Sequence, residues 1–202
     1  MLSRIAESLY WIGRYVERAD DTARILDVTV HQLLEDSSVD PDQTSRVLLK
    51  VLGMEAPDQP LDVWSLTDIV AFSRDTSGGC SIVEAISAAR ENARGMRNVI
   101  STELWEVINK YYHFVNNYPV DYFKTRGLYD FTLAAGENCS VMRCYMDSTL
   151  THNDVWALIR LGVHLERTAQ IARIISCKLY DIFTLTNGNE NMPVENYQYT
   201  VL

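Results

Sequence analysis

One stretch of this chain occurs twice, and this repeat constrains the fold more than any other feature. The copies read GRYVERADDTARI at residues 13–25 and GVHLERTAQIARI at residues 162–174, with the shared pattern Gly-x3-Glu-Arg-x5-Arg. Apolar residues recur every three or four positions through both copies, over residues 9–33 and 158–182. Such spacing is typical of a long amphipathic helix whose apolar seam packs against neighbouring helices. The repeat therefore predicts two long and equivalent helices.

The rest of the chain also indicates helices joined by polar loops. Ser81 and Glu84 form a capping box at the start of one helix, and Gly53 follows the end of another. No segment shows convincing strand alternation. We expect helices at about residues 3–34, 44–52, 65–72, 81–100, 103–116, 128–147 and 151–183.

The predicted fold is all-α, a bundle of four or five long helices with short helices attached. A length of 202 residues fits one domain, and we expect residues 1–202 to form a single helical domain. Within it, residues 186–202 should form a loop followed by the start of a further helix that is cut off, because Asn187-Gly188 and Pro193 are turn and breaker signals.

The charge balance limits the kinds of partner. A net charge of −9 and a pI of about 4.9 argue against a nucleic-acid-binding surface, which needs a basic face. Arg4 and Glu7 interrupt what would be the apolar core of a signal peptide, and no run of about 18 apolar residues follows. We therefore expect a cytoplasmic protein that binds neither nucleic acid nor a membrane.

Charged residues of the repeat lie beside the apolar seam. Glu17 and Arg24 are about two helical turns apart, as are Glu166 and Arg173, so each pair borders one helix face. One hypothesis is that these charges pair between helices and fix the register. Another is that they converge on a polar pocket, in which arginine forks bind a carboxylate or a phosphate. The candidate residues of this pocket are Glu17, Arg24, Glu166, Arg173, Arg14, Arg90, Glu91 and Arg94.

The repeat also predicts which charges meet. Two helices with the same seam and the same charged line can pack antiparallel about a local two-fold axis. In that arrangement Glu17 lies beside Arg173 and Glu166 lies beside Arg24, because a partly desolvated carboxylate needs a facing guanidinium.

A glycine stands one turn before the glutamate in both copies. Gly13 and Gly162 fall in mid-helix, where glycine costs about 1 kcal/mol relative to alanine. We expect either the close approach of another helix at these positions or room for a ligand or an arginine side chain.

The sequence lacks the patterns of common metal and nucleotide sites. No histidine follows a glutamate by three residues, as di-iron helical bundles require, and Cys139 and Cys144 are poorly spaced for zinc. Neither a Gly-x-Ser-x-Gly motif nor a P-loop is present. We expect no metal and no cofactor.

With the repeat and the segment Ala-Arg-Glu-Asn-Ala-Arg both in view, the chain resembles the bacterial alpha-E domain family. The matching stretches are residues 1–19, residues 89–94 with Trp105, and residues 161–167. The resemblance implies an all-helical domain, and genes of the family typically lie beside those of ATP-grasp-type ligases and transglutaminase-like peptidases. It thereby implies a role in forming or modifying peptide bonds.

The chain departs from the family pattern in its second copy. Val163 stands where an arginine is usual, and a second acidic residue is usual near Gln170. Family members generally continue through more helices after this point.

Three functions of different classes remain open at this stage. The first is a helical accessory domain that acts with an ATP-grasp-type ligase or a transglutaminase-like peptidase and binds a peptide or the partner. The second is an amide-bond enzyme with Glu17 or Glu166 as general base. The third is a purely structural oligomerisation module.

Overall fold

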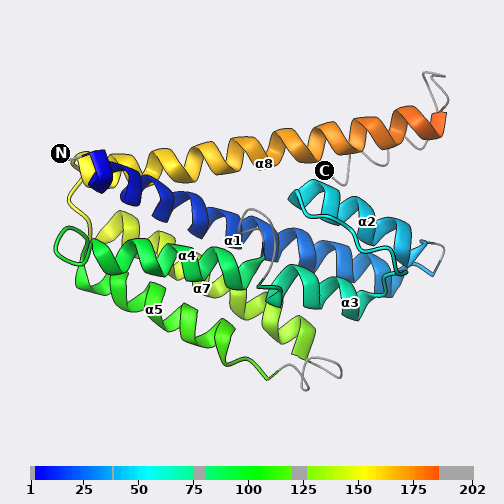
Figure 1. Cartoon of the computed structure of the whole chain (residues 1–202), viewed down its shortest axis with the longest axis horizontal. Helices are drawn as coiled ribbons and strands as arrows, with labels where there is room; N and C mark the ends of the chain where they lie inside the picture. The colour runs from blue at the N-terminus through cyan, green and yellow to red at the C-terminus, as the bar shows by residue number, and fades with distance from the viewer. Residues whose placement is uncertain (1–2, 38, 75–80, 120–126, 187–202) are drawn as a thin grey trace.

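The computed structural model describes residues 3–37, 39–74, 81–119 and 127–186, without the side chains of residues 128 and 178–186. Every regular element in these ranges is helical, so the predicted all-α fold is confirmed (Figure 1). The elements are α1 (Ser3–Glu35), α2 (Pro41–Leu52), α3 (Val63–Thr67), the π-helical turn η1 (Asp68–Phe72), α4 (Ile82–Gly95), α5 (Thr102–Asn116), α7 (Leu128–Ser148) and α8 (Asp154–Thr186). The loop and further helix were predicted at 186–202; Thr186 is the last residue of α8, and residues 187–202 lie outside the described residues.

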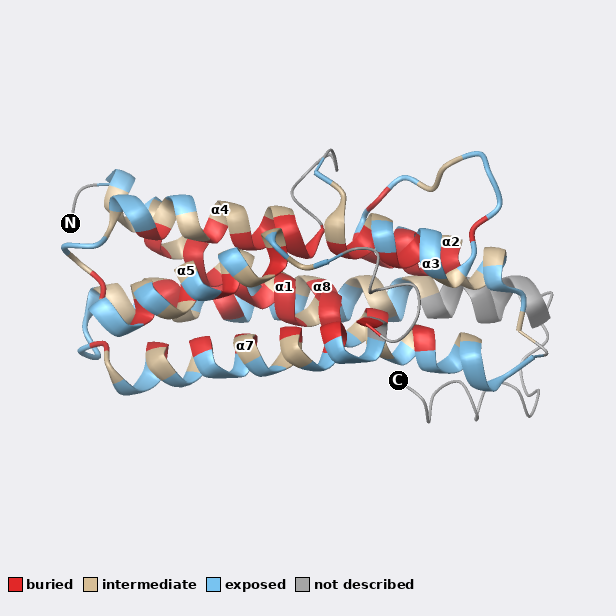
Figure 2. Ribbon diagram, turned by 90° about the horizontal axis from the view of Figure 1, so that it is seen from below, coloured by how far each residue is buried: buried red, intermediate tan, exposed pale blue. Residues whose placement is uncertain are grey.

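Helix α1 is the centre of the molecule. Its apolar seam packs against α4 and α7, and α5 closes the bundle by packing against both of these helices. Helix α8 lies along the opposite side of α1, and α2 packs beside both α1 and α8 (Figures 1 and 2). Among the described elements, α8 is therefore attached to the bundle mainly through α1.

Side-chain caps explain where several helices begin. The Ser81 hydroxyl accepts a hydrogen bond from the Glu84 amide, which confirms the predicted start of α4. Helix α3 starts earlier than predicted, because Asp62 accepts from the amide of Ser65. Helix α8 starts later than the predicted residue 151, because the Asn153 side chain accepts from the Val155 amide and the helix begins at Asp154.

Helices α1 and α8 run parallel, in contact at the two repeat glycines. Both helices run from left to right in Figure 1. A Cβ atom added at Gly13 would lie 2.0 Å from the carbonyl oxygen of Ile159, and one added at Gly162 would lie 2.1 Å from that of Tyr10. The two backbones thus approach too closely for any side chain at these positions. Of the two explanations for the glycines, the close approach of another helix is the one found.

The antiparallel packing predicted from the repeat is wrong. A line of charges on a helix face looks the same to a parallel and to an antiparallel partner, so the sequence pattern does not fix the direction. In the structure the local pseudo-two-fold axis runs along the helix pair, and equivalent residues of the two copies lie at the same level.

The two copies of the seam have different surroundings. In α1 the seam is buried, with Ile12, Val16 and Leu26 each 0% exposed. The equivalent residues of α8 are Leu161, Leu165 and Ile175, and these are 49%, 45% and 45% exposed. The prediction that both seams pack against neighbours therefore holds for α1 only, among the residues described.

None of the described helices combines enough length with enough apolar character to cross a bilayer.

We predict that alanine at either repeat glycine destabilises the domain. Gly13→Ala and Gly162→Ala should each lower the free energy of unfolding by at least about 2 kcal/mol, because the new methyl group forces α1 and α8 apart. Gly136→Ala in α7 is the matched control, since no atom lies within 4 Å of its added Cβ. The control should be neutral or stabilising by up to about 1 kcal/mol. Denaturant titrations followed by circular dichroism measure these changes, and equal stabilities for all three variants would contradict the close contact.

Candidate functional site

The Glu-Arg pairs of the two copies bind each other across the α1–α8 interface. Glu166 of α8 is 0% exposed and sits between two arginines of α1. The Arg18 Nε atom donates to Glu166 Oε1 at 2.8 Å, and Arg14 Nε donates to Glu166 Oε2. Arg14 also donates to the Tyr10 hydroxyl at 2.6 Å, which holds its guanidinium in place. Both carboxylate oxygens of Glu166 are thus occupied.

Glu17 of α1 makes the equivalent ion pair in the other direction, with an arginine of α8. Its side chain is 1% exposed, and Arg167 of α8 donates through Nε to Glu17 Oε1 at 2.5 Å. Val163 occupies the position in α8 that Arg14 occupies in α1, so α8 supplies no second arginine there. Arg143 of α7 is the cation beside the second carboxylate oxygen, with Nη1 at 4.0 Å from Glu17 Oε2, and it leaves Oε2 without a hydrogen bond.

Asp20 extends the cluster towards α7. It is 2% exposed, forms an ion pair with Arg143, and accepts from Arg24 Nε at 3.1 Å. Arg143 in turn donates to the Ser140 hydroxyl at 3.1 Å. Ion pairs therefore join three helices, α1, α7 and α8, and we call this group of neighbouring charged side chains the Glu-Arg cluster. Its members are Arg14, Glu17, Arg18, Asp20, Asp21, Arg24, Arg143, Glu166, Arg167 and Arg173.

The predicted partners of the two glutamates are wrong, although each glutamate does pair with an arginine of the other helix. Arg173 lies 3.6 Å from Glu166 of its own helix, and Arg24 binds Asp20 of its own helix. In a parallel helix pair, equivalent residues of the two copies lie at the same height along the helices. Each glutamate therefore meets the arginine that directly follows the equivalent glutamate of the other helix. That arginine is Arg18 for Glu166 and Arg167 for Glu17.

The candidate residues of α4 belong to a different surface. Arg90 donates to the Asn109 side chain of α5 at 2.8 Å and stacks over the Tyr112 ring at 4.4 Å. Glu91 pairs with Arg90 at 2.8 Å and with Arg94 at 2.9 Å. The structure thus brings together Arg14, Glu17, Arg24, Glu166 and Arg173 of the predicted set. It places Arg90 at the α4–α5 contact, with Glu91 and Arg94 exposed beside it on α4.

Sequence reasoning missed half of the Glu-Arg cluster. Arg18 and Arg167 follow the glutamates in both copies, so the repeat carried the signal for them as clearly as for Arg24. Asp20 falls next to the seam, and its burial follows from the arrival of α7. Arg143 lies outside the repeat, and no pattern in the sequence indicates that it reaches α1.

The arginines determine the protonation of Glu166. Burial opposes its ionisation, but the hydrogen bonds and charges of Arg18 and Arg14 outweigh burial and hold the pKa of Glu166 below its usual value. The carboxylate is therefore ionised at neutral pH, fully hydrogen-bonded and a weak base. Likewise, the hydrogen bond to Glu17 raises the pKa of Arg167.

The pKa of Asp21 is shifted in the opposite direction from that of Glu166. Burial, followed by the negative charges of Glu17 and Asp20, raises the pKa of Asp21 to about 7. Its Oδ2 atom is buried without a hydrogen-bond partner. An Asp21 proton is thus gained or lost close to neutral pH, at the edge of the α1–α8 interface.

Among the described residues, no three His, Cys, Asp or Glu side chains are grouped so that they could hold a metal ion. The carboxylates of Glu17, Asp20 and Glu166 are paired with guanidinium groups.

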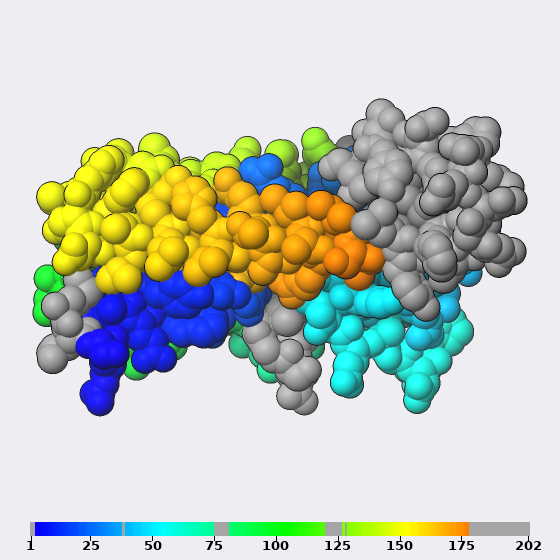
Figure 3. Space-filling view, turned by 90° about the horizontal axis from the view of Figure 1, so that it is seen from above, coloured from blue at the N-terminus to red at the C-terminus, as the bar shows by residue number. Residues whose placement is uncertain are grey.

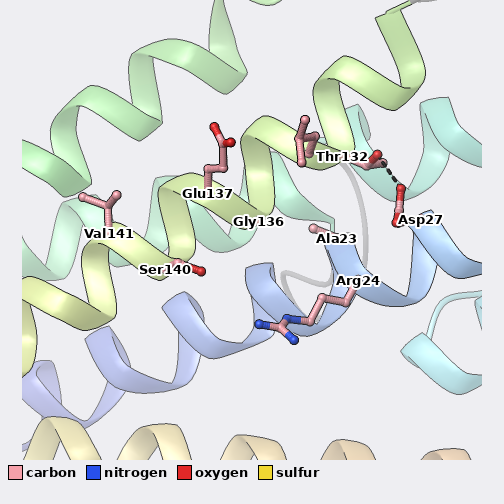
Figure 4. Close-up of a pocket in the computed structure, with 9 residues that line it drawn as sticks. Ala23, Arg24, Asp27, Thr132, Gly136, Glu137, Ser140 and Val141 are labelled. Carbon is pink, nitrogen blue, oxygen red and sulfur yellow. Dashed lines mark hydrogen bonds between the residues drawn. The ribbon is translucent and has the colours of Figure 1, made fainter.

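A groove lies next to the Glu-Arg cluster, between α1 and α7 (Figure 4). It encloses about 600 Å3, and its apolar wall contains Leu133 and Val141, which are 49% and 44% exposed. The Thr132 hydroxyl donates to Asp27 at 2.7 Å and so joins the two helices within the groove. The residues that line it are Ala23, Arg24, Asp27, Thr132, Leu133, Gly136, Glu137, Ser140 and Val141.

The sequence comparisons agree with this geometry. Residues 1–202 match the Alpha-E family, described as a predicted alpha-helical domain with a conserved ER motif. The chain belongs to this family. The dipeptide Glu-Arg occurs twice in the chain, at residues 17–18 and 166–167, and both copies lie in the Glu-Arg cluster.

Curated relatives of the Alpha-E chain are found in mycobacteria. An uncharacterized protein of Mycobacterium bovis and one of Mycobacterium tuberculosis are each 24% identical over 202 residues. These alignments cover 87% of this chain and 22% of the relative, so the chain spans about a fifth of the length of these proteins. No solved structure gave a significant match.

We predict that the reciprocal pair Glu17–Arg167 couples α1 to α8. In a double-mutant cycle with Glu17→Gln and Arg167→Met, the coupling energy should be about 1–3 kcal/mol, because Glu17 is buried. The control cycle uses Glu91 and Arg94, a pair that is 51% and 55% exposed and should couple by at most about 0.5 kcal/mol. Both cycles are measured by denaturant unfolding. Equal coupling energies in the two cycles would contradict the prediction that the buried Glu17–Arg167 ion pair couples α1 to α8.

We also predict a pH effect from Asp21. The pKa of Asp21 is about 7 in the folded Alpha-E domain and close to 3.8 when unfolded, so the folded state holds an extra proton between these values. Above about pH 7 the buried charge lowers the free energy of unfolding. Asp21→Asn should therefore stabilise the domain by about 1–3 kcal/mol near pH 8, with a smaller gain near pH 5. Glu106→Gln, at an exposed position of α5, is the control and should show no such pH dependence.

Proposed function

We propose that this Alpha-E domain is a non-catalytic accessory domain that acts with an ATP-grasp-type peptide ligase or a transglutaminase-like peptidase. On this proposal, the groove between α1 and α7 binds a segment of a peptide or of the partner. The observation that carries it is the contrast between two neighbouring places. The buried carboxylates of Glu17, Asp20 and Glu166 are paired with arginines of the same chain, and the groove beside them is open.

The state of the two glutamates argues against a general base. Glu166 has both oxygens bound by arginines and a lowered pKa, so it has little tendency to take a proton. Glu17 has one oxygen bound to Arg167 and the other buried within 4.0 Å of Arg143. Such ion pairs hold helices together, and this supports a binding domain over an amide-bond enzyme.

The groove has the chemistry for a short peptide segment. Leu133 and Val141 present apolar surface for an aliphatic side chain, and Arg24, with a side chain 62% exposed, provides a guanidinium for a carboxylate. Figure 4 shows Arg24 extended along α1 beneath Ser140. At Gly136 no atom lies within 4 Å of an added Cβ, which leaves space for a bound backbone.

The Glu-Arg cluster positions one end of this groove. Asp20 holds Arg24 at 3.1 Å, and Arg143 binds both Asp20 and the hydroxyl of Ser140. On this proposal, the ion pairs act by orienting Arg24 and Ser140 towards the bound segment.

The test is a direct binding measurement. We expect the purified chain to bind an ATP-grasp-type ligase or a transglutaminase-like protein of the same organism, as measured by isothermal titration calorimetry. Gly136→Leu should weaken this binding by at least about tenfold, because the leucine fills the groove. ATP turnover of the ligase, measured with and without the chain, shows whether the complex acts on the reaction.

Gly95→Leu is the matched control for this variant. It makes the same substitution at the end of α4, where again no atom lies within 4 Å of the added Cβ, and it should bind as the wild type does. Equal binding by both variants would exclude the groove as the site. Failure of the wild type to bind either protein would overturn the proposed function.

A further inference from the structure

The Arg24 guanidinium has an unused binding end in the groove between α1 and α7. Its Nε atom donates to Asp20 at 3.1 Å, and among the described residues it makes no other hydrogen bond or ion pair. The Nη1 and Nη2 atoms of an arginine form a fork that binds both oxygens of one carboxylate. The Arg24 side chain is 62% exposed, and Figure 3 shows a part of α1 at the surface between α7 and α8. A ligand can therefore reach this fork from solvent.

Asp20 fixes the direction of the fork. It is 2% exposed, and its Oδ2 atom is bound by Arg143 of α7 as well as by Arg24 of α1. One buried carboxylate thus anchors two guanidinium groups. The Glu-Arg cluster as a whole has six arginines and only four carboxylates. An anion bound at Arg24 therefore balances part of an excess of positive charge.

Ser140 of α7 supplies a second donor at the same place. Its hydroxyl oxygen accepts from Arg143 Nη2 at 3.1 Å, so the hydroxyl hydrogen is available to a ligand. Figure 4 shows the Ser140 hydroxyl above the Arg24 guanidinium, on the opposite wall of the groove. Donors from two helices thus converge on one point, as the binding of an oxyanion requires.

The apolar part of the groove begins one helical turn from Ser140. Leu133, Gly136 and Ser140 follow each other at steps of three and four on α7, so they lie in a line along the groove. No neighbouring atom lies within 4 Å of a Cβ added at Gly136, and Leu133 beyond it is 49% exposed. One turn rises about 5.4 Å, which is close to the reach of an aliphatic side chain from the carboxylate of its own residue. An α-carboxylate at Ser140 therefore places its side chain over Gly136.

Two carboxylates in the groove limit the charge of the ligand. Asp27, which accepts from the Thr132 hydroxyl at 2.7 Å, and the exposed Glu137 both line the groove. They repel further negative charge, so a phosphate dianion or an acidic peptide segment is disfavoured relative to a single carboxylate. The groove therefore selects one carboxylate that is joined to an apolar side chain.

We propose that the groove binds the free C-terminus of a peptide whose last residue is aliphatic. The α-carboxylate binds the Arg24 fork and the Ser140 hydroxyl, and the last side chain lies over Gly136 against Leu133. In an internal aspartate the carboxylate is itself the end of the side chain, so no apolar group of the same residue reaches Gly136. This inference rests on the proposed function, whose groove it uses, and it names the chemical group that the groove binds.

Three short peptides test the proposal by isothermal titration calorimetry on the full chain. They are an N-acetylated tripeptide that ends in leucine with a free carboxylate, the same tripeptide with a C-terminal amide, and an amidated tripeptide with a central aspartate. The free acid should bind with a dissociation constant of about 1 mM or lower, and each amidated peptide at least about tenfold more weakly. An equal concentration of inorganic phosphate should not displace the free acid.

Substitutions of Arg24 test its role. Arg24→Met should weaken binding of the free acid by at least about tenfold, and Arg24→Lys should restore only part of the affinity, because an ammonium group lacks the fork. Arg94→Met is the matched control, since Arg94 is 55% exposed and pairs with Glu91 of its own helix as Arg24 pairs with Asp20. The control should bind as the wild type does. Circular dichroism should be unchanged in these variants, because Arg143 still pairs with Asp20.

Four results would overturn the inference. These are equal affinities for the acid and its amide, equal losses in Arg24→Met and Arg94→Met, displacement by an equal concentration of phosphate, and no binding of the acid at millimolar concentration. The measurements use no protein partner, so the two proposals fail separately. A chain that binds the ligase without distinguishing acid from amide keeps the proposed function and loses this inference. A chain that binds the acid and neither protein does the reverse.

Discussion

The contact between the backbones of α1 and α8 at Gly13 and Gly162 is the constraint on which the rest of the structure depends. It places the two copies of the repeat at one level and brings each buried glutamate within reach of the other helix's arginine. The desolvation of Glu17 and Glu166 is tolerable only because these guanidinium groups arrive in register. The ion pairs in turn disfavour any sliding of one helix along the other. Close packing and charge pairing thus support each other, and neither is stable alone.

Much of the fold followed from local signals in the chain. The spacing of apolar residues and the capping residues identified the helices, because both signals depend on neighbours within one or two helical turns. The Ser81 cap and the buried face of α1 are examples. The direction of α8 relative to α1 did not follow, since a charged line on a helix carries no information about the polarity of its partner. The connections through α2 to α7 decide that direction, and they act over the whole chain.

The site was predictable to the extent that the repeat encodes it. Glu17 and Glu166 stood out because both copies contain them at the edge of a seam, and Arg14 lies one turn from Glu17. Arg143 enters the cluster only through the packing of α7 against α1, which is a long-range event. Arg90 and Arg94 shared a helix face in the sequence, but Arg90 packs on the aromatic side chains of α5 and Arg94 pairs with Glu91 of its own helix, so neither reaches the Glu-Arg cluster.

Helix α1 is synthesised first and α8 last among the described helices, so their contacts form only late in synthesis. Arg167 and Glu17 are 150 positions apart, so loop closure between them is entropically expensive and belongs to a late step of folding. When a ribosome has produced α1, α4, α5 and α7, Glu17 still lacks Arg167 and Arg14 still lacks Glu166, whereas Arg24 of α1 and Arg143 of α7 are already present for Asp20. Helix α8 therefore brings both a cation and an anion to α1. Until α8 is made, the α1 surface of an unfinished chain exposes charges of both signs that the finished domain buries.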